Sequence, residues 1–449
     1  MRPCPTVDLA ALAMSRACEN GLGDVLMRLA RQLKRRHEKF RLLHSHQARE
    51  NDMATSDATE HLLSAVDRIR PLIMENAANA EANRQLSGVV YDAMYQAGLF
   101  AMLAPKARGG FELHPVESMR VLEAVARIDS ASAWNLLMNQ AVSNFAAWLP
   151  AEGADELFCG GVPTSASGFY PTATATRADG GWRITGQVPF ASGCHHAKWL
   201  AMPAVEMEDG HPKSDPTTGQ PAIFVGFFPR TAGSVKETWN TVGMRGTGSA
   251  DIAVHDLFVP DRLTGFIGPL KSPAPGFEGP LYRMFPLHGL LGEAIVSVGV
   301  AAAAVDEAVR LCKAKTAAYN AIPLREQQLA QYHVGKAKAR VEAARDTLYR
   351  AADAAYEDVA SGGRGTSLSI EAKIRVQLAL SFAAETCGEA IRYVNDAIGA
   401  SSIRLESPFE RHFRDLHVLM QHSDKSSARY ASAGRLMFGL ENDWVWLSF

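Results

Sequence analysis

Apolar residues recur at helical spacing in the first and last parts of the chain. Between residues 53 and 150 they return every three or four positions, as at Leu62, Val66 and Ile69, which is the spacing of one face of a helix. Alanine-rich segments with the same period fill residues 274–439, and they are long enough to form an antiparallel bundle. The pattern therefore predicts helical regions on both sides of the middle.

Between residues 151 and 260 the hydrophobic period shortens to that of strands. The segments are short, rich in β-branched and aromatic residues, and bounded by Gly, Pro and Asp, as is typical of β-structure. Asp179-Gly180-Gly181 predicts a hairpin turn. An alternating apolar and polar run near the end predicts a half-buried strand that Pro260 ends. The middle of the chain is therefore predicted to be a small β-domain.

A glycine-rich turn, GMRGTGS, precedes that last strand within the stretch Trp239–Pro260. Glycine tolerates the unusual backbone angles that such a turn requires. A nucleotide phosphate loop would place a helix after the glycines, with its N-terminal N–H groups facing the phosphates. Because a strand pattern follows instead, we favour a structural turn at a domain seam over a phosphate loop.

Residues 1–52 do not continue into the pattern that follows them. They carry a basic cluster, RQLKRRHEKFR, which fits a short basic helix that contacts a partner or a targeting peptide, although Glu19, Asp24 and Glu38 argue against a transit sequence. Met53 opens a segment with a Ser/Thr/Asp helix cap before helical apolar spacing. We therefore interpret residues 1–52 as an extension that is either not native or disordered.

The chain length and composition fit a multidomain globular protein. The 449 residues have room for two or three domains, and 47% hydrophobic with 21% charged residues is ordinary for folded proteins. The predicted segments are the extension at 1–52, an N-terminal helical domain at 53–150, a middle β-domain at 151–265 and a C-terminal helical bundle at 266–449.

Charge, cysteine spacing and hydropathy exclude several classes of protein. The formal net charge is −2, which lacks the basic excess of a nucleic-acid-binding protein. The six cysteines are scattered singly, as in a cytoplasmic protein with reduced thiols rather than a zinc or disulfide scaffold. The most apolar run, Leu290–Val305, is interrupted by Glu293 and therefore suits a buried bundle helix better than a membrane span.

The triplet Cys194-His195-His196 contains metal-ligating residue types. Adjacent residues of a strand point to opposite faces, so consecutive positions rarely converge on one ion. We predict no metal site there or elsewhere in the chain.

Several ordered segments together resemble the acyl-CoA dehydrogenase superfamily. They are GLFAMLAPKARGG, IDSASAW, GGWRITGQVPFASGCHHAKW, WNTVGMRGTGSADIAVHDLFVP and GASSIRLESPFERHFRDLHVLMQH. The resemblance covers about residues 53–439. It implies an α+β fold with an N-terminal helical domain, a middle β-barrel or sandwich and a C-terminal four-helix bundle, usually in a homotetramer.

The C-terminal segment discriminates between chemistries within that superfamily. Many dehydrogenases place a proton-abstracting glutamate after an arginine-aspartate pair, here Arg414-Asp415. This sequence has Ser423 at that position, which cannot act as a carboxylate base, and His422 before it. The pattern is similar to the oxygenase component of two-component flavin-dependent monooxygenases. The resemblance implies a partner NAD(P)H:flavin reductase that supplies reduced flavin, FMNH₂ or else reduced FAD, and a C4a-hydroperoxide formed on that flavin with O₂.

The resemblance also assigns roles to individual residues. It implies that His422 and Ser192 are catalytic, with His422 near flavin C4a and Ser192 near N5. Other residues match the family's flavin pocket, namely Phe190, Ala191, Ser192, Ser167, Arg283, Gly399 and Ser401. Some members use a histidine on the helix before the middle domain. That region here offers only Asn139, Ser143 and Asn144 for substrate binding.

Each assignment has a structural alternative. A lone histidine such as His422 is more often a hydrogen-bonded structural residue than a catalyst. Ser192 could simply end a strand, and Arg283 could belong to an interface. The pair Arg414-Asp415 is expected to be a structural ion pair rather than part of the chemistry.

The resemblance leaves three functions open. The first is a reduced-flavin-dependent monooxygenase acting on a small aromatic or heteroatom-bearing substrate. The second is an acyl-CoA dehydrogenase with its base relocated, which would hold FAD tightly. The third is a non-catalytic oligomeric scaffold, which would need no flavin pocket.

Overall fold

A computed structural model describes residues 57–448 of the chain, apart from 216–218, 269–271, 317–321 and 364–366. Residues from Ala58 onward form one unit by their internal contacts. The extension predicted at 1–52 lies outside the described residues. The boundaries predicted at 150 and 265 stay predictions.

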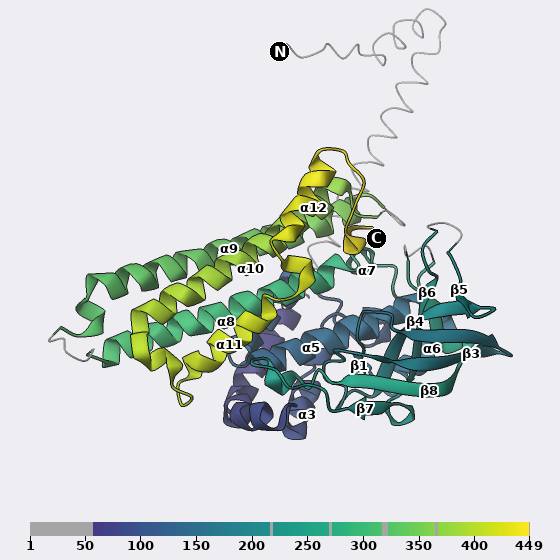
Figure 1. Ribbon diagram of the computed structural model, residues 1–449, viewed down its shortest axis with the longest axis horizontal. Coiled ribbons are helices and arrows are strands. Elements are labelled where there is room, and N and C mark those ends of the chain that lie inside the picture. Colours follow the sequence, from purple (N-terminus) through teal and green to yellow (C-terminus); the bar gives the residue numbers. More distant parts are fainter. Residues whose placement is uncertain (1–56, 216–218, 269–271, 317–321, 364–366, 449) are drawn as a thin grey trace, which may run out of the picture. The chain divides into compact units, whose positions relative to one another are not determined.

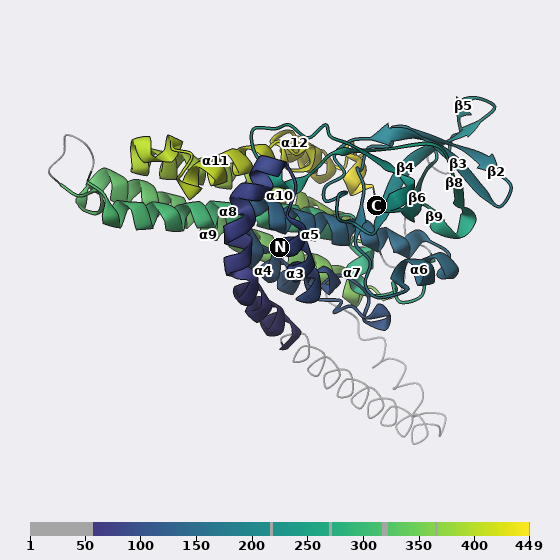
Figure 2. The same cartoon turned by 90° about the horizontal axis from the view of Figure 1, so that it is seen from below.

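The first region is helical, as its apolar period predicted. It contains a helix over residues 57–83, α3 (Gly88–Gln96), α4 (Pro115–Ala126) and α5 (Ser130–Ser143). Helix α6 (Ala151–Phe158) follows within the segment predicted to be β-structure, so that prediction was wrong for residues 151–158. Helix α5 begins where the Asp129 carboxylate accepts a hydrogen bond from the Ser132 N–H at 2.8 Å, which satisfies an otherwise unpaired helix donor. Every α5 residue except Ala141 is buried. Helix α5 lies between the long helices and the strands (Figures 1 and 2).

The middle region forms one mixed sheet. Its strands are β1 (Ser165–Ala166), β2 (Ala173–Ala178), β3 (Gly181–Val188), β4 (Trp199–Glu208), β5 (His211–Pro212), β6 (Ile223–Pro229), β7 (Ser234–Lys236), β8 (Asp251–Pro260) and β9 (Thr264–Phe266). The sheet order is β7-β8-β3-β2-β4-β6-β9, with β1 and β5 also paired to β4. Strands β1 and β2 run parallel to β4, whereas the other pairs are antiparallel.

Two local predictions in the sheet are confirmed. Strands β2 and β3 form an antiparallel hairpin across Asp179-Gly180, and Gly180 has φ +69°. The run predicted as a half-buried strand is β8, which ends at Pro260. It pairs with β3 on one side and β7 on the other, so it lies inside the sheet.

The last region is a bundle of long helices. Its elements are α7 (Pro280–Arg283), α8 (Leu287–Ala314), α9 (Gln328–Ser361), α10 (Ile370–Ile398), α11 (Pro408–Leu419) and α12 (Ala428–Met437). Helices α8, α9, α10 and α11 pack on one another, and α8 also packs on α4 and α5. The predicted class of fold is confirmed, with the middle strands arranged as a single mixed sheet.

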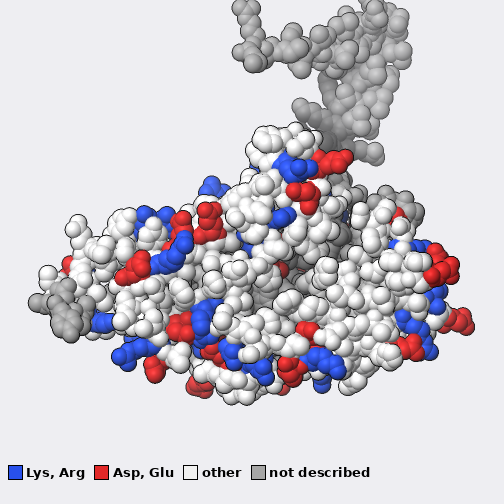
Figure 3. Space-filling view, viewed as in Figure 1, with Lys and Arg blue, Asp and Glu red and all other residues white. Residues whose placement is uncertain are grey.

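Helix α8 contains the apolar run seen in the sequence. Among the described helices it alone is long and apolar enough to cross a membrane by those two criteria, and 94% of its most apolar window is buried. The apolar side chains therefore pack into the bundle core. On the face in Figure 3, acidic and basic side chains are interspersed and the middle is mostly uncharged.

The glycine-rich turn before β8 lies between α5 and α11. A Cβ added at Gly243 would lie 2.4 Å from the Arg414 carbonyl oxygen, so only glycine permits this close approach. The Met244 N–H donates to Asp415 Oδ1 at 2.5 Å, and the Ser130 hydroxyl donates to Asp415 Oδ2 at 2.5 Å. The buried Asp415 side chain thus joins the turn to both helices, and burial raises its pKa to about 6.

The expected pairing of Arg414 with Asp415 was wrong. Arg414 pairs instead with Glu81 at 2.5 Å and with Glu410, and its guanidinium also donates to the Val242 carbonyl. Both side chains are structural, as expected, but they point to different partners because neighbouring helix positions lie about 100° apart around the axis.

Candidate active site

A cavity of about 470 Å³ lies where α5, the glycine-rich turn, α8 and the segment after α11 meet. That volume is within the range of small-molecule sites, about 300–1,000 Å³. Most of the lining is apolar or aromatic. The aromatic residues of the lining are Trp134, Phe145, Phe169, Tyr170, Phe190, Trp239, Phe285 and Trp446. A planar apolar ring system is therefore the ligand shape that these walls suit best.

A chain of hydroxyl groups ends at Ser192 on one side of the cavity. The Trp134 indole N–H donates to Ser192 Oγ at 3.0 Å, and Ser192 Oγ lies 2.7 Å from Ser249 Oγ. Ser249 Oγ lies 2.7 Å from Thr247 Oγ1, which donates to the Met244 carbonyl at 2.8 Å.

The two ends of this chain fix its direction. An indole N–H can only donate, and a carbonyl oxygen can only accept. The Thr247 hydroxyl donates its one hydrogen to the Met244 carbonyl, so it can only accept from Ser249. Ser249 therefore donates to Thr247 and accepts from Ser192. Ser192 therefore keeps only an oxygen lone pair for a ligand, and it faces the cavity as a hydrogen-bond acceptor.

Asn139 and Gly193 hold Ser192 in place from behind. The Asn139 side-chain amide donates to the Ser192 carbonyl at 3.0 Å, and its oxygen accepts from the Tyr91 hydroxyl at 2.6 Å. Gly193 has φ +73°, a left-handed conformation that favours glycine. The local backbone at Ser192 is therefore set by buried hydrogen bonds from α5.

Gly193→Ala is expected to lower the free energy of unfolding by about 1–3 kcal/mol. Besides the strain at positive φ, the added Cβ would lie 2.4 Å from Asn135 Oδ1 and 2.7 Å from Asn139 Nδ2, which forces those amides to move. Urea unfolding of both proteins measures the loss. Gly160→Ala is the matched control, because Gly160 also has positive φ, +89°, but has no atom within 4 Å of the added Cβ. Equal losses in the two variants would contradict the steric part of the argument.

His422 lines the cavity at the end of α11 and lies against Trp134. The centroids of the two rings are 4.8 Å apart with the planes tilted by 59°. The ring forms part of the cavity wall, and 42% of its side-chain surface is accessible. Burial and the nearby Lys425 ammonium lower the pKa of His422 to about 4, with Asp424 opposing them. The lowered pKa keeps His422 neutral near pH 7.

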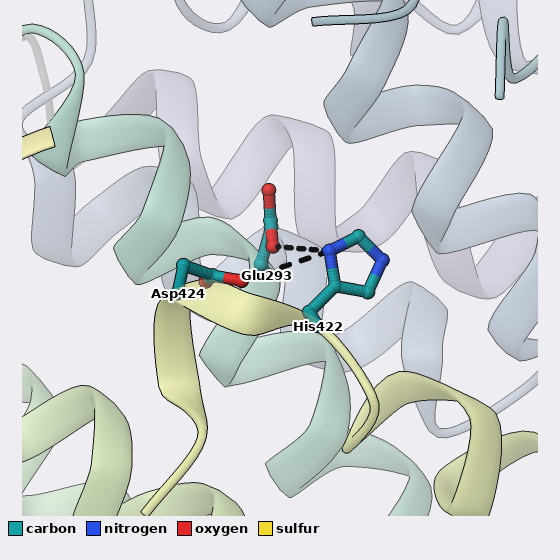
Figure 4. Close-up of side chains that lie close together, drawn as sticks. All are labelled: Glu293, His422 and Asp424. Carbon is teal, nitrogen blue, oxygen red and sulfur yellow. Dashed lines mark ion pairs between the residues drawn. The ribbon is translucent and has the colours of Figure 1, made fainter. Parts of the chain in front are cut away.

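Two carboxyl groups lie on the Nδ1 side of the His422 ring, those of Glu293 and Asp424 (Figure 4), and Lys425 contacts both of them. Glu293 Oε2 lies 3.4 Å and Asp424 Oδ1 lies 3.6 Å from this nitrogen. Lys425 Nζ lies 3.0 Å from Glu293 Oε2 and 3.7 Å from Asp424 Oδ2. Burial and the Asp424 carboxyl raise the pKa of Glu293, and Lys425 opposes them. Burial lowers the pKa of Lys425, but Asp424 and Glu293 outweigh it, so the net shift is upward.

The same group has the ligand types of a metal site. One ligand atom each from Glu293, His422 and Asp424 lies within 4.8 Å of the others. The Lys425 ammonium already lies between the two carboxyl groups, where it supplies the positive charge that a metal ion would bring. Cys194-His195-His196 does not converge, since His195 contacts Glu237 at 3.0 Å and His196 contacts the Leu86 carbonyl at 2.8 Å.

The structure brings only some of the predicted site residues to the cavity. His422, Ser192 and Phe190 line it, and Ala191 lies between the last two with its N–H bonded to the Ala250 carbonyl. The buried Ser167 hydroxyl is bonded to the adjacent Gly168 carbonyl and is not part of the lining.

The other predicted residues lie away from the lining. Arg283 donates to the Gly363 carbonyl, and Ser401 accepts from Lys315 in the short helix Gly399–Ile403. The predicted substrate residues Asn139, Ser143 and Asn144 are all buried behind the wall of the cavity. The Ser143 hydroxyl lies within hydrogen-bonding distance of the Asn139 carbonyl on α5, the Pro163 carbonyl and the Ser165 hydroxyl. Roles for these residues in binding stay predictions.

Sequence reasoning missed several side chains that do line the cavity. Glu293 was visible only as a charge that interrupts an apolar helix, which is a signal because isolated charges are rarely buried without a function or a partner. Trp134 was interpreted as a core residue, and it is buried, but it also forms the wall beside His422. His288 and Trp446 also belong to the lining, and nothing in their local sequence patterns indicates that.

Comparison with known proteins places this geometry in a family. The model of the acyl-CoA dehydrogenase N-terminal domain matches residues 59–156, and that of the C-terminal domain matches residues 291–426. A pigment production hydroxylase from a Rhodococcus species is 30% identical over 375 residues, which cover 81% of this chain and 92% of the relative. The chain belongs to the acyl-CoA dehydrogenase superfamily.

Within this superfamily the chain groups with the oxygenase components of flavin-dependent monooxygenases. Indole-3-acetate monooxygenase from Pseudomonas putida is 29% identical over 392 residues, or 86% of this chain and 95% of the relative. The solved structure of XiaF from a Streptomyces species, in complex with FADH₂ and glycerol, superimposes with a TM-score of 0.78 at 24% identity over 87% of this chain and 98% of that one. The superfamily fold is thereby confirmed.

Proposed function

We propose that the protein is a monooxygenase that binds reduced flavin in the cavity and uses O₂ to oxygenate a small aromatic substrate. The supporting observation is a cavity with aromatic walls that presents His422 and Ser192, with Ser423 where a dehydrogenase would have its glutamate. The named relatives that are monooxygenases or hydroxylases support the same reaction class. Bound reduced flavin supplies the two electrons that activate O₂.

The polarity of Ser192 fits reduced flavin better than oxidised flavin. The central ring of reduced flavin carries an N–H at N5, where oxidised flavin has a bare nitrogen. Because the hydroxyl chain leaves Ser192 as an acceptor, Ser192 can accept from that N–H but has no hydrogen left for a bare nitrogen. FMN is the flavin we propose first, with FAD as the alternative, since relatives with either cofactor are known by name.

The remaining roles follow from the positions of the side chains. Neutral His422 can accept a proton or a hydrogen bond from the substrate. A flavin bound against Trp134, Phe169 and Trp446 would displace water from the cavity, which strengthens polar contacts inside it. A separate flavin reductase would deliver the cofactor, as the name of one relative, an oxygenase subunit, also suggests. A cytoplasmic homotetramer stays a prediction.

Rapid mixing tests this proposal directly. Protein saturated with FMNH₂ without oxygen is mixed with O₂, and the absorbance of the flavin is followed. We expect a transient absorbance that differs from both reduced and oxidised FMN, followed by slower appearance of oxidised FMN than in a protein-free control. Reoxidation at the rate of free FMNH₂ would contradict the proposal.

One observation keeps the dehydrogenase as a second candidate. Glu293 is a carboxyl group on the cavity lining and is therefore a possible relocated base. It is, however, bonded to Lys425 at 3.0 Å, which lowers its basicity. A dehydrogenase would bind FAD tightly, and an acyl-CoA would bleach that FAD in the absence of oxygen. A non-catalytic scaffold would bind flavin in neither redox state.

A further inference from the structure

The hydrogen atom of neutral His422 has two possible positions, and the surrounding atoms discriminate between them. A neutral imidazole carries one hydrogen, on Nδ1 or on Nε2, and the nitrogen without it is the acceptor. The carboxyl oxygens beside Nδ1 are Glu293 Oε2 at 3.4 Å and Asp424 Oδ1 at 3.6 Å. In Figure 4 the other ring nitrogen, Nε2, is directed away from both carboxyl groups.

Lys425 makes the nearer oxygen an acceptor whatever the charge of Glu293. Lys425 Nζ, which can only donate, lies 3.0 Å from Glu293 Oε2. In a neutral Glu293 the hydrogen is favoured on Oε1, because the C=O oxygen of a carboxyl group accepts from an ammonium better than its O–H oxygen does. Oε2 therefore accepts from Lys425 and has a second lone pair for Nδ1. The contacts of Oε2 thus favour a hydrogen on Nδ1 of His422, with Glu293 either ionised or carrying its hydrogen on Oε1.

We propose that Glu293 and Asp424, held by Lys425, are positioning residues that keep the hydrogen of His422 on Nδ1, so that Nε2 accepts from an O–H or N–H group of the substrate. This inference rests on the proposed function. It narrows the substrate class to aromatic compounds with a hydroxyl or ring N–H, such as phenols or indoles. Among the described residues no side chain hydrogen-bonds to Nε2, which leaves it open to a ligand.

Lys425 also explains how two carboxyl groups can lie beside a neutral base. Carboxylates alone would attract a second proton to the imidazole and convert it to imidazolium, which is no acceptor. The Lys425 ammonium is fully buried and opposes that second proton. The charged groups that face His422 are Glu293 from α8 and Asp424 and Lys425 from the short helix Ser423–Lys425, whereas the facing α5 residue is Trp134.

Nitrogen NMR of the flavin-free protein tests the proposal. Protein labelled with ¹⁵N-histidine is measured by solid-state NMR near pH 7.5, and the His422 signals are assigned by their loss in His422→Asn. We expect a hydrogen-bearing Nδ1 and a bare Nε2. A hydrogen on Nε2, or hydrogens on both nitrogens, would overturn the proposal. Because no flavin is present, this result is independent of the mixing experiment, so the two ideas can fail separately.

Variants identify the cause of the hydrogen's position. Replacing the cluster with apolar residues of similar size, in Glu293→Leu/Asp424→Leu/Lys425→Met, should shift the single Nδ1–H form to a mixture of both forms. Glu293→Gln is the control, because the amide oxygen can still accept from Lys425 and from Nδ1, and it should keep the wild-type spectrum. An unchanged spectrum in the triple variant would overturn the role of the carboxyl groups. If that variant does not fold, the wild-type spectrum still decides the proposal.

Discussion

His422→Ala is expected to speed the release of H₂O₂ about 100-fold when FMNH₂-loaded protein meets O₂. The imidazole fills one wall of the cavity beside Trp134. Its loss leaves room for water next to the flavin. A neutral imidazole whose hydrogen is held at Nδ1 does not donate protons to the flavin, whereas water molecules in its place would. Reduced flavin would then pass two electrons and two protons to O₂, which gives H₂O₂ and oxidised flavin.

The measurement needs no substrate, because H₂O₂ can be followed with a coupled peroxidase dye after rapid mixing. His417→Ala is a suitable control, since His417 is exposed on α11, the helix that precedes His422, and does not line the cavity. It should release H₂O₂ at the wild-type rate. If His422→Ala also releases H₂O₂ at that rate, His422 has no part in protecting the flavin.

The architecture was predictable because its signals are local. Hydrophobic period distinguishes the helix at Leu62 and Val66 from the alternating strand that became β8. The Asp179-Gly180 turn and the stop at Pro260 come from residue types whose backbone preferences act within a few positions. Such signals do not require knowledge of what each element packs against.

The candidate site was predictable only in part because its residues meet across long sequence separations. Glu293 and Lys425 are 132 residues apart. In the sequence, neither residue by itself indicates the other as its partner. His422 was found because a family motif surrounds it, not because its chemistry is visible in isolation. Their shared position depends on how α8 packs against α11, and that packing is absent from any local pattern.

Two polar residues on α5 were predicted to line the site but are buried behind its wall. Asn139 and Ser143 were predicted to bind substrate because they are polar residues on a helix that the family uses for this purpose. In the structure their side chains bond to the Ser192 and Pro163 carbonyls. Sequence gives the polarity of a side chain, but only the fold decides whether it faces a cavity or satisfies a buried backbone group.

Lys425→Met is expected to lower the free energy of unfolding by about 3–5 kcal/mol near neutral pH. Lys425 is fully buried, and its ammonium is the counter-charge between Glu293 and Asp424. Methionine fills similar space but leaves the buried carboxyl groups without a positive partner. Urea unfolding measures the loss, and Lys313→Met, at an exposed lysine of α8, should change stability by less than about 0.5 kcal/mol.

The loss in Lys425→Met should depend on pH in a defined direction. The pKa of Glu293 is already raised in the folded protein, and Lys425 is the group that opposes this rise, so its removal raises that pKa further. A carboxyl group with a raised folded pKa favours the fold below its unfolded pKa, about 4.3, and loses that contribution as pH rises through the folded pKa. The deficit should therefore be larger at pH 8 than at pH 5.

A second substitution separates charge from packing in this variant. Glu293→Leu/Lys425→Met removes one carboxyl group together with the ammonium, and an apolar pair of similar volume often replaces a buried ion pair without loss. We expect it to recover most of the stability lost in Lys425→Met and to show a weaker dependence on pH. A double variant as unstable as Lys425→Met at every pH would mean that the lysine stabilises the fold by its shape. The charge balance beneath His422 would then not explain why Lys425 is buried there.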